Sequence, residues 1–324
     1  MDTWKREFIR NLFHYSAARM HIERAFLIKH PNVPTKLYKY RCFSCNHIEA
    51  FEKNILWMSS PDRFNDPYDA AVHFEPGRFL VEDRTVDEYL KHAETLKKNF
   101  EAGIEWQPEK IKNPIASREW LSKMTDELLK GHPVPARNEF MEVMAKILKT
   151  RDEDAVRRMA SFFRNSYSVL SLSENPAATL MWSHYSDSHR GFAIEYDFSN
   201  LGYHDLRRRL CFPIFYTRKP RDATRYMART DMSDYNNLFG LYMCLIKKDE
   251  WAYEKEWRIL HAIGASHANS ELTMPTPSAV LLGADVAPND EAMMSVLCRT
   301  RAIPLKRMVR KSNSYDMSVI DLPI

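Results

Sequence analysis

The segments Tyr167-Ser168-Val169-Leu170-Ser171-Leu172 and Phe192-Ala193-Ile194-Glu195-Tyr196 alternate apolar side chains with small or acidic ones. This period of two is the pattern of a β-strand that buries one face. Further strand signals lie at residues 36–41, 55–59, 210–216, 257–262, 279–282, 303–309 and 316–322. Helical periodicity is interspersed among them without a regular strand-helix-strand rhythm. The sequence therefore predicts an α+β fold built on a mixed, mostly antiparallel sheet.

The order of these signals predicts three segments in one continuous fold. Residues 1–34 form an N-terminal helical segment, because Trp4, Phe8 and Leu12 recur at helical spacing before prolines end the helix. Residues 35–75 and 166–324 form the α+β core, and the charged stretch 76–165 forms a helical insertion. Thr150 and Glu153 are spaced like a capping box, which predicts that the last helix of the insertion begins there.

The composition indicates an ordinary globular protein of a reducing compartment. Hydrophobic residues make up 44% of the chain and charged residues 28%. Five scattered cysteines argue against a disulfide framework, so we expect a cytoplasmic location. The longest apolar run, 237–246, is too short to cross a bilayer, and we expect no membrane partner. The net charge is only +4, but basic runs such as 207–209 favour either contact with nucleic acid or a solvated face.

Three polar motifs lie far apart in the chain. The first combines Leu37-Tyr38-Lys39-Tyr40-Arg41 with Trp57-Met58-Ser59-Ser60 and Phe64-Asn65-Asp66-Pro67-Tyr68-Asp69. The second is Leu180-Met181-Trp182-Ser183-His184-Tyr185, followed by His189-Arg190-Gly191. The third is Lys247 or Lys248, then Trp251, and then Tyr253-Glu254-Lys255-Glu256-Trp257-Arg258. We expect the three motifs to converge, so that a guanidinium and a carboxylate face one another across a cleft. Residues expected to line it together are Arg41, Ser59, Asn65, His184 and Glu256.

At these motifs the chain resembles the bacterial family called domain of unknown function 2971. The resemblance rests on the Tyr-Lys-Tyr-Arg start, the Phe-Asn-Asp-Pro loop, the Met-Trp-x-His-Tyr segment and the Glu-x-Glu-Trp-Arg end, and it extends from residue 36 to residue 324. That family name implies no activity. The function must therefore be inferred from the residues themselves.

The order of Arg41, Ser59 with Ser60, and Glu254-x-Glu256 also resembles the Arg, Ser-x-Ser and Glu-x-Glu pattern of ADP-ribosyltransferases. The resemblance implies that NAD is the substrate, that Arg41 holds a phosphate of NAD, and that both serines support the nicotinamide pocket. It further implies that Glu256, the last glutamate of the pattern, grips the ribose. We therefore expect Glu256 to be catalytic, and Glu254 to orient the acceptor or take its proton. The chain departs from the pattern in its adjacent serines and in the long segment before Glu254.

This chemistry suits the residue types. Cleavage of the ribose-nicotinamide bond develops an oxocarbenium ion that a carboxylate stabilises, and a guanidinium binds a diphosphate with two parallel hydrogen bonds. Further residues expected to bind the nucleotide are Tyr38, Asn65, Asp66, Trp182, His184, Tyr185, Arg190 and Arg258. Aromatic residues of the second and third motifs, Trp182, Tyr185, Trp251, Tyr253 and Trp257, are expected to form an aromatic floor below a charged rim. Such a protein would act on a nucleic-acid or protein acceptor in bacterial defence, as a toxin, or in a stress response.

Structural interpretations of the charged residues stay open beside these. Glu254, Glu256 and Arg258 alternate, which also predicts a cross-strand ladder of ion pairs with no other role. Arg41 could pair with Asp66 or Asp69 and fasten the Asn-Asp-Pro loop instead of binding phosphate.

Two other classes of function also stay open. The cluster His184, His189, Glu195 and Asp197 would suit a metal-dependent nuclease, although its spacing fits no standard ligand pattern. Cys42, Cys45 and His47 resemble half a zinc site without its second half, so packing is the simpler interpretation of these residues. The third class is a non-catalytic binding module of a defence system, with residues 76–165 as its partner surface.

Overall fold

The structure is a computed structural model that describes residues 2–73, 98, 102, 125–126, 128–227, 234, 236–262 and 271–323. The chain divides into two compact units. The first comprises Met1–Ala71, Phe163–Pro220 and Asn236–Ile324, and the second comprises Val72–Phe162 and Arg221–Tyr235. The segment predicted as an N-terminal helical part therefore belongs to the first unit, and the second unit adds Arg221–Tyr235 to the segment predicted as an insertion.

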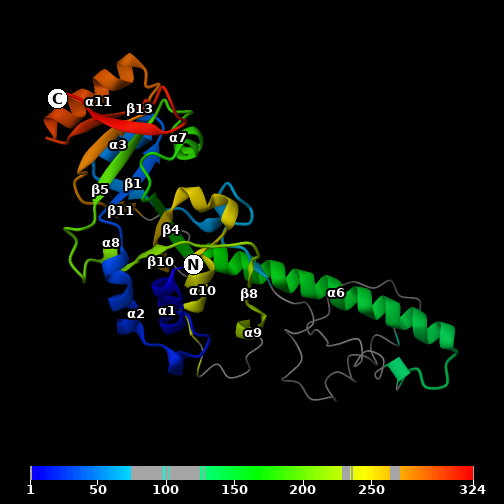
Figure 1. Cartoon of the computed structure of the whole chain (residues 1–324). Coiled ribbons are helices and arrows are strands. Elements are labelled where there is room, and N and C mark those ends of the chain that lie inside the picture. The colour runs from blue at the N-terminus through cyan, green and yellow to red at the C-terminus, as the bar shows by residue number, and fades with distance from the viewer. Residues whose placement is uncertain are drawn as a thin grey trace. The chain divides into compact units, whose positions relative to one another are not determined.

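The first unit is built on an eight-stranded sheet (Figure 1). Its strands, in spatial order, are β14 (Met317–Asp321), β13 (Leu305–Arg310), β12 (Ala279–Leu282), β5 (Phe192–Asp197), β1 (Lys36–Arg41), β4 (Tyr167–Ser173), β10 (Glu256–Ala262) and β6 (Cys211–Pro213). Only the β12–β13 pair is parallel among these neighbours. The predicted α+β fold with a mixed, mostly antiparallel sheet is confirmed. Strand β6 lies at an edge of the sheet, a position that suits Pro213, because proline cannot donate to a ladder.

Shorter elements surround this sheet. In the first unit they are α1 (Thr3–Leu12), η1 (Ala17–Arg19), α2 (Ile22–Lys29), η2 (His30–Asn32), α3 (Cys45–Glu52), β2 (Ile55–Trp57), η3 (Pro61–Arg63), α7 (Thr179–Tyr185), α8 (Leu206–Arg209), β7 (Phe215–Thr217), α10 (Phe239–Met243), β9 (Ile246–Lys248), η5 (Asp249–Glu254), β11 (Glu271–Thr273) and α11 (Pro288–Thr300). Strand β2 pairs with β11, and β7 pairs with β9. Among the described residues no helix has the length and apolar character needed to span a bilayer.

The second unit contains β3 (Val72–His73), which pairs with β8 (Arg221–Asp222), and α9 (Thr224–Met227). It also contains most of α6 (Val134–Asn165), whose last residues belong to the first unit. The predicted helix start at Thr150 is wrong, because α6 runs through this position without interruption. The Thr150 hydroxyl donates to the carbonyl oxygen of Lys146 at 3.1 Å, one turn earlier, instead of capping a new helix. Most of the predicted insertion before α6 lies outside the described residues.

Alternation along the central strands buries both faces of the sheet. Leu37, Leu172 and Ile194 belong to one buried cluster, whereas Tyr40 and Trp182 belong to another. Full burial of one such apolar side chain stabilises the fold by roughly 1.5–3 kcal/mol. The sheet is therefore a rigid support for the polar residues that emerge between these apolar positions.

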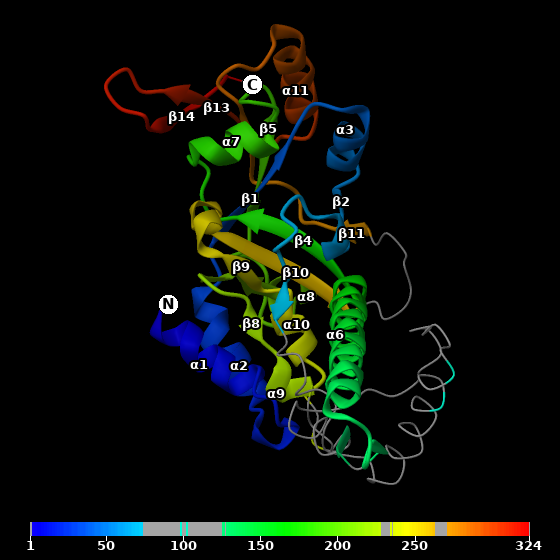
Figure 2. The same cartoon turned by 90° about the vertical axis from the view of Figure 1, so that its right-hand side faces the viewer.

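Strands β1 and β4 separate within the sheet. They share one register pair, Tyr38 with Ser173, although β1 pairs along its whole length with β5 and β4 along its whole length with β10. Figure 2 shows β4 and β10 running side by side while β1 diverges from them. The free edge of β4 is covered instead by Ser59, whose backbone exchanges two hydrogen bonds of 2.9 Å with Val169. The backbone of β1 beyond Tyr38 thus leaves open space beside β4.

Candidate functional site

A pocket of about 430 Å³ lies where β1 and β4 separate. That volume is within the usual range of small-molecule sites, roughly 300–1,000 Å³. Its walls come from β1, from the loop after β2, from β4, from α7 and from β10. The residues expected to meet in one cleft, Arg41, Ser59, Asn65, His184 and Glu256, all line this pocket. Segments from the beginning, middle and end of the chain therefore converge here.

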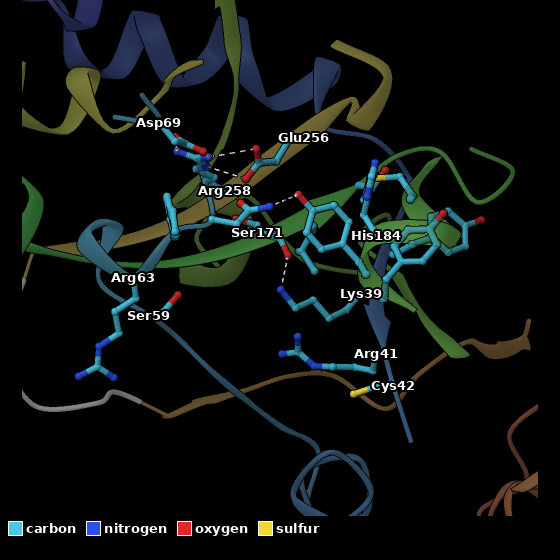
Figure 3. A pocket seen from close by; sticks show the side chains of 18 of the residues that line it. Lys39, Arg41, Cys42, Ser59, Arg63, Asp69, Ser171, His184, Glu256 and Arg258 are labelled. Carbon is cyan, nitrogen blue, oxygen red and sulfur yellow. Dashed lines mark hydrogen bonds and ion pairs between the residues drawn. The ribbon is translucent and has the colours of Figure 1, made fainter. Parts of the chain in front are cut away.

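A buried network of ion pairs forms one wall of the pocket (Figure 3). The Arg258 guanidinium donates to both carboxylate oxygens of Asp69, at 2.8 and 2.5 Å. It also donates to both oxygens of Glu256, at 2.7 and 3.0 Å. The Lys247 amine donates to Glu256 at 3.0 Å and to Glu254 at 2.5 Å. All five side chains are at most 5% exposed, so each charge depends on its partners rather than on water.

Charge balance in this network determines where protons reside. Three carboxylates face two cations, so one carboxylate must carry a proton for the network to be neutral. Burial raises the pKa of Glu254, and the neighbouring Glu256 raises it further, to about 7 despite the opposing effect of Lys247. Burial would also raise the pKa of Glu256, but Arg258 and Lys247 outweigh burial and lower it. Glu254 is therefore the residue that takes up and releases a proton near neutral pH.

The local backbone explains why two carboxylates reach one amine. Glu254 ends η5, whereas Glu256 begins β10, and Lys255 between them has a left-handed conformation with φ of 43°. The prediction that Glu254 and Glu256 lie on one strand is wrong, but the turn at Lys255 directs both toward Lys247. The Ser173 hydroxyl donates to the Glu254 carbonyl oxygen at 2.6 Å and holds this turn against β4.

A hydroxyl connects Glu254 to the pocket. Tyr185 lines the pocket from α7 and donates its hydroxyl proton to Glu254 at 2.8 Å, while the side-chain amide of Asn65 donates to the same hydroxyl at 3.5 Å. Burial, followed by the charge of Glu254, raises the pKa of Tyr185 well above its ordinary value. Tyr185 therefore stays protonated and can relay a proton between the pocket and Glu254.

Two cations of β1 line the pocket, and neither has a carboxylate partner among the residues that the structure describes. Lys39 and Arg41 are two residues apart on a strand, so they share a face, and Figure 3 shows them extending from β1 opposite the ion-pair network. Lys39 donates to the Ser171 carbonyl oxygen at 2.8 Å. Within the described part of the chain, no carboxylate lies within ion-pair distance of either residue.

The pKa values of these two cations show the cost of their burial. Burial lowers the pKa of Lys39 well below its ordinary value, and the charge of Arg41 lowers it further. Burial also lowers the pKa of Arg41, to about 10, which leaves its guanidinium charged at neutral pH. An anion placed between the two side chains would relieve both penalties.

The remaining wall carries smaller polar groups. Cys42 and His47 line the pocket beside Arg41, with the Cys42 sulfur 3.5 Å from Nδ1 of His47. That nitrogen also lies 3.0 Å from the Cys42 carbonyl oxygen. The Phe64 ring also lines the pocket and stacks on the Arg258 guanidinium at 4.8 Å from its centroid. These contacts hold the pocket walls in place from both sides.

Residues predicted for the site divide into two groups. Tyr38, Arg41, Ser59, Asn65, His184, Tyr185, Glu256 and Arg258 line the pocket. The lining does not include Ser60, Asp66, Trp182, Arg190 and Glu254. Of this second group, Glu254 is connected to the pocket by the hydrogen bond from Tyr185.

The other four predicted residues are held by local contacts. Ser60 donates to the Arg164 carbonyl oxygen at 2.9 Å, and Asp66 accepts from the backbone of Tyr68 at 2.8 Å. Trp182 is fully buried and donates to the Pro176 carbonyl oxygen, while Arg190 pairs with the exposed Asp187. Each of these side chains thus fixes a loop or fills the core instead of facing the pocket.

The predicted aromatic floor is wrong. Of its five members only Tyr185 lines the pocket. Trp182 and Trp257 are buried in the two apolar clusters, and Trp257 stacks on Trp4 with ring centroids 6.2 Å apart. The lining instead includes four buried charged side chains, Asp69, Lys247, Glu256 and Arg258.

The structure also decides between the alternative interpretations of the charges. The predicted pairing of Arg41 with Asp66 or Asp69 is wrong, because Asp69 is bound by Arg258 and lies 3.4 Å from Lys247. The predicted ion pairs of Glu254, Glu256 and Arg258 do form, but as a buried network with Lys247 and Asp69 rather than as a ladder along one strand.

The residues proposed as metal ligands do not gather. His184 lines the pocket, His189 lies 3.1 Å from the Ser183 hydroxyl, and Glu195 accepts from Tyr38 at 3.0 Å. In the described ranges no group of three or more His, Cys, Asp or Glu side chains could hold a metal ion. Cys45 is exposed while Cys42 lines the pocket, so the possible half zinc site is not assembled.

Sequence reasoning gave no role to three residues that shape the site. Two of them, Lys39 and Lys247, lie inside the quoted motifs, so their positions were a usable signal. Their partners, however, depend on the folded arrangement. Ser171 stands out only as a polar residue within a strand, and its carbonyl oxygen anchors Lys39. The free edge of β4 that exposes this carbonyl is a property of the sheet and not of the local sequence.

The fold and the pocket define this chain as an α+β protein with a cation-lined pocket at a split in its sheet. Residues 181–259 match the model of a family described as Protein of unknown function (DUF2971), which confirms the resemblance to that family over this segment. The matched segment carries His184, Tyr185, Glu254, Glu256 and Arg258. No curated protein and no solved structure matches the chain.

Proposed function

We propose that the pocket binds NAD or a closely related nucleotide and that the protein transfers or releases its ADP-ribosyl group. The observation that supports this best is the pair Lys39 and Arg41, two partly buried cations without a carboxylate partner in the described part of the chain, which line a pocket of about 430 Å³. In this proposal the two side chains hold the diphosphate. Charge-assisted hydrogen bonds of this type are about twice as strong as neutral ones.

The proposed reaction breaks the bond between C1′ of the ribose and the nicotinamide nitrogen. The bonding electrons leave with nicotinamide, which departs neutral, and the hydroxyl of water or of an acceptor forms the new bond to C1′. The proton of that hydroxyl goes to Tyr185, which passes its own proton to ionised Glu254. A base whose pKa lies near the working pH is the most effective one, and Glu254 meets this condition.

In this proposal Glu256 acts differently from what the likeness to ADP-ribosyltransferases implies. Its two carboxylate oxygens accept three hydrogen bonds from Arg258 and Lys247, which leaves little capacity to grip a ribose hydroxyl. We therefore assign to Glu256 the role of positioning Lys247 and Arg258, and to Glu254 the proton transfer. The acceptor is a nucleic acid, a protein or water.

A non-catalytic role for the same pocket is the alternative that the experiment must separate from catalysis. In that case the nucleotide binds through Lys39 and Arg41 but nicotinamide is not released. No observation in the described part of the chain favours the metal-dependent nuclease, because its four candidate ligands do not meet.

The test is incubation of the purified protein with NAD labelled separately in nicotinamide and in adenine, with and without nucleic acid and cell lysate. The proposal predicts release of nicotinamide and, with the right acceptor, transfer of the adenine label. Glu254→Gln should abolish release while NAD still binds, and Arg41→Gln should weaken binding. Binding without release would restrict the function to a binding module, and absence of both would contradict the proposal.

A further inference from the structure

A second hollow lies on the first unit, outside the site described above. It has a volume of about 560 Å³ and is formed by α1, the segment that follows α1, and α2. Its lining consists of Glu7, Arg10, Asn11, His14, Ala18, Arg19, His21 and Arg24. Three guanidiniums and two imidazoles therefore share one hollow with a single carboxylate.

Among the residues that the structure describes, the positive charges of this hollow are not balanced by carboxylates. Arg24 pairs with Glu7 at 2.8 Å, which uses the one carboxylate of the lining. Arg10 and Arg19 are exposed, and among the described residues no carboxylate forms an ion pair with either. Like charges gathered in one concave surface raise its potential and attract anions.

The walls of the hollow are fixed by hydrogen bonds rather than by charge. The backbone of His21 donates to the Asn11 carbonyl oxygen at 2.9 Å, which joins the end of α1 to the start of α2. The side-chain amide of Asn236 donates to the carbonyl oxygens of Leu12 and His14, at 3.0 and 2.5 Å. The shape of the hollow therefore does not depend on a ligand.

One imidazole of the lining is also oriented. Nδ1 of His14 accepts a hydrogen bond of 3.0 Å from the backbone of Ser16. The proton of the neutral ring consequently sits on Nε2, which makes His14 a donor toward an anion.

We propose that this hollow between α1 and α2 is a second anion site, which binds a small molecule carrying two or more consecutive phosphate groups. Arg10 and Arg19 would each donate to phosphate oxygens in a bidentate way, and the concave shape suits one compact ligand rather than a long chain. The site shares no lining residue with the pocket at the sheet split. The proposal of this second site is therefore independent of the proposed reaction.

The test is isothermal titration calorimetry of the full chain with tripolyphosphate at low and physiological salt. The variant Arg10→Ala/Arg19→Ala should lose binding at this site at least about tenfold, since each lost charge-assisted contact is worth about that factor. Arg6→Ala is the matched control, because Arg6 is an exposed arginine of α1 outside the lining, and it should bind like the unaltered protein. Lys39→Gln/Arg41→Gln, introduced in all proteins, removes any contribution from the first pocket.

Two further measurements identify the class of molecule that carries the phosphates. Competition of tripolyphosphate by a nucleoside triphosphate at equal affinity supports the proposal. Tighter binding of a single-stranded oligonucleotide than of tripolyphosphate, with loss in the double variant, would overturn it in favour of a nucleic-acid surface. Equal binding of tripolyphosphate by the double variant and the Arg6→Ala control would overturn it outright. Thermal unfolding of both variants checks that they are folded.

Discussion

Glu254→Gln and Glu256→Gln should have very different effects on stability, although both carboxylates pair with Lys247. Glu256→Gln removes an ionised acceptor from two buried cations, at distances of 2.7–3.0 Å. Breaking a buried ion pair by removing one partner costs about 3–5 kcal/mol, because the remaining charge stays buried. At pH 6 Glu254 is mostly protonated, so Glu254→Gln replaces a neutral group by a neutral group of the same shape. We expect it to cost less than about 1 kcal/mol.

The difference in stability between Glu254→Gln and the unaltered protein should change with pH in one direction. The pKa of Glu254 in the folded state lies above its ordinary value, so the folded protein holds a proton that the unfolded chain has lost. The contribution of Glu254 to the free energy of unfolding therefore falls as pH rises from about 4.5 to about 7. A shift of this size corresponds to on the order of 3 kcal/mol. Relative to the unaltered protein, Glu254→Gln should become more stable over that interval.

Urea unfolding at several pH values, followed by the fluorescence of the buried tryptophans, measures both effects. Glu256→Gln should have the lower midpoint at every pH above about 5, since the lowered pKa of Glu256 keeps it ionised there. The charge assignment would be refuted by Glu254→Gln being as destabilising as Glu256→Gln at pH 6. A difference between Glu254→Gln and the unaltered protein that moves the opposite way with pH would also refute it.

Three further predictions follow from other contacts. Lys29→Met should lower the free energy of unfolding by about 2–4 kcal/mol, because the buried amine donates to three backbone carbonyls at 2.6–3.0 Å. Thermal unfolding measures this loss, and Lys53→Met is the control, because Lys53 is exposed. Gly283→Ala should destabilise the protein by about 1–3 kcal/mol, since the new Cβ would lie 2.0 Å from a backbone oxygen. Gly202→Ala is the control, because its Cβ would meet nothing within 4 Å. Equal melting temperatures of the two variants would contradict this prediction. If NAD is cleaved, kcat/KM should rise with pH through about 7 as Glu254 loses its proton, and a flat profile would exclude Glu254 as the base.

The fold was largely predictable because strand periodicity is a local property. The alternating residue types at Lys36–Arg41 and Phe192–Asp197 predict strands, and both segments form them, although five consecutive residues of β5 are buried. The helix start at Thr150 was misjudged because a capping pattern competes with continued helix formation, and the long α6 prevails. The left-handed Lys255 was equally hidden, since nothing in its identity requires positive φ.

The sequence predicted many of the residues that line the site, but not which of them pair with one another. Clusters of polar residues in three motifs were enough to expect convergence at Arg41 and Glu256. Which carboxylate binds which cation depends on strand register and loop geometry, so Asp69 was assigned to Arg41 although it binds Arg258. Trp182 shows the same difficulty, because an aromatic residue within a polar motif can face the core as readily as the pocket.

The central claim is that Lys39 and Arg41 hold the phosphates of a nucleotide ligand. Isothermal titration calorimetry with ADP-ribose tests it most directly, on the unaltered protein, on Arg41→Gln and on the exposed control Lys53→Gln. With Arg10→Ala/Arg19→Ala introduced in all three proteins to remove the proposed second anion site, we predict one site per chain, unchanged affinity in the control, and a loss of about ten- to a hundredfold in Arg41→Gln, as expected for one charge-assisted contact of about 1.5–3 kcal/mol. No binding to the unaltered protein, or equal affinity in all three, would contradict the claim.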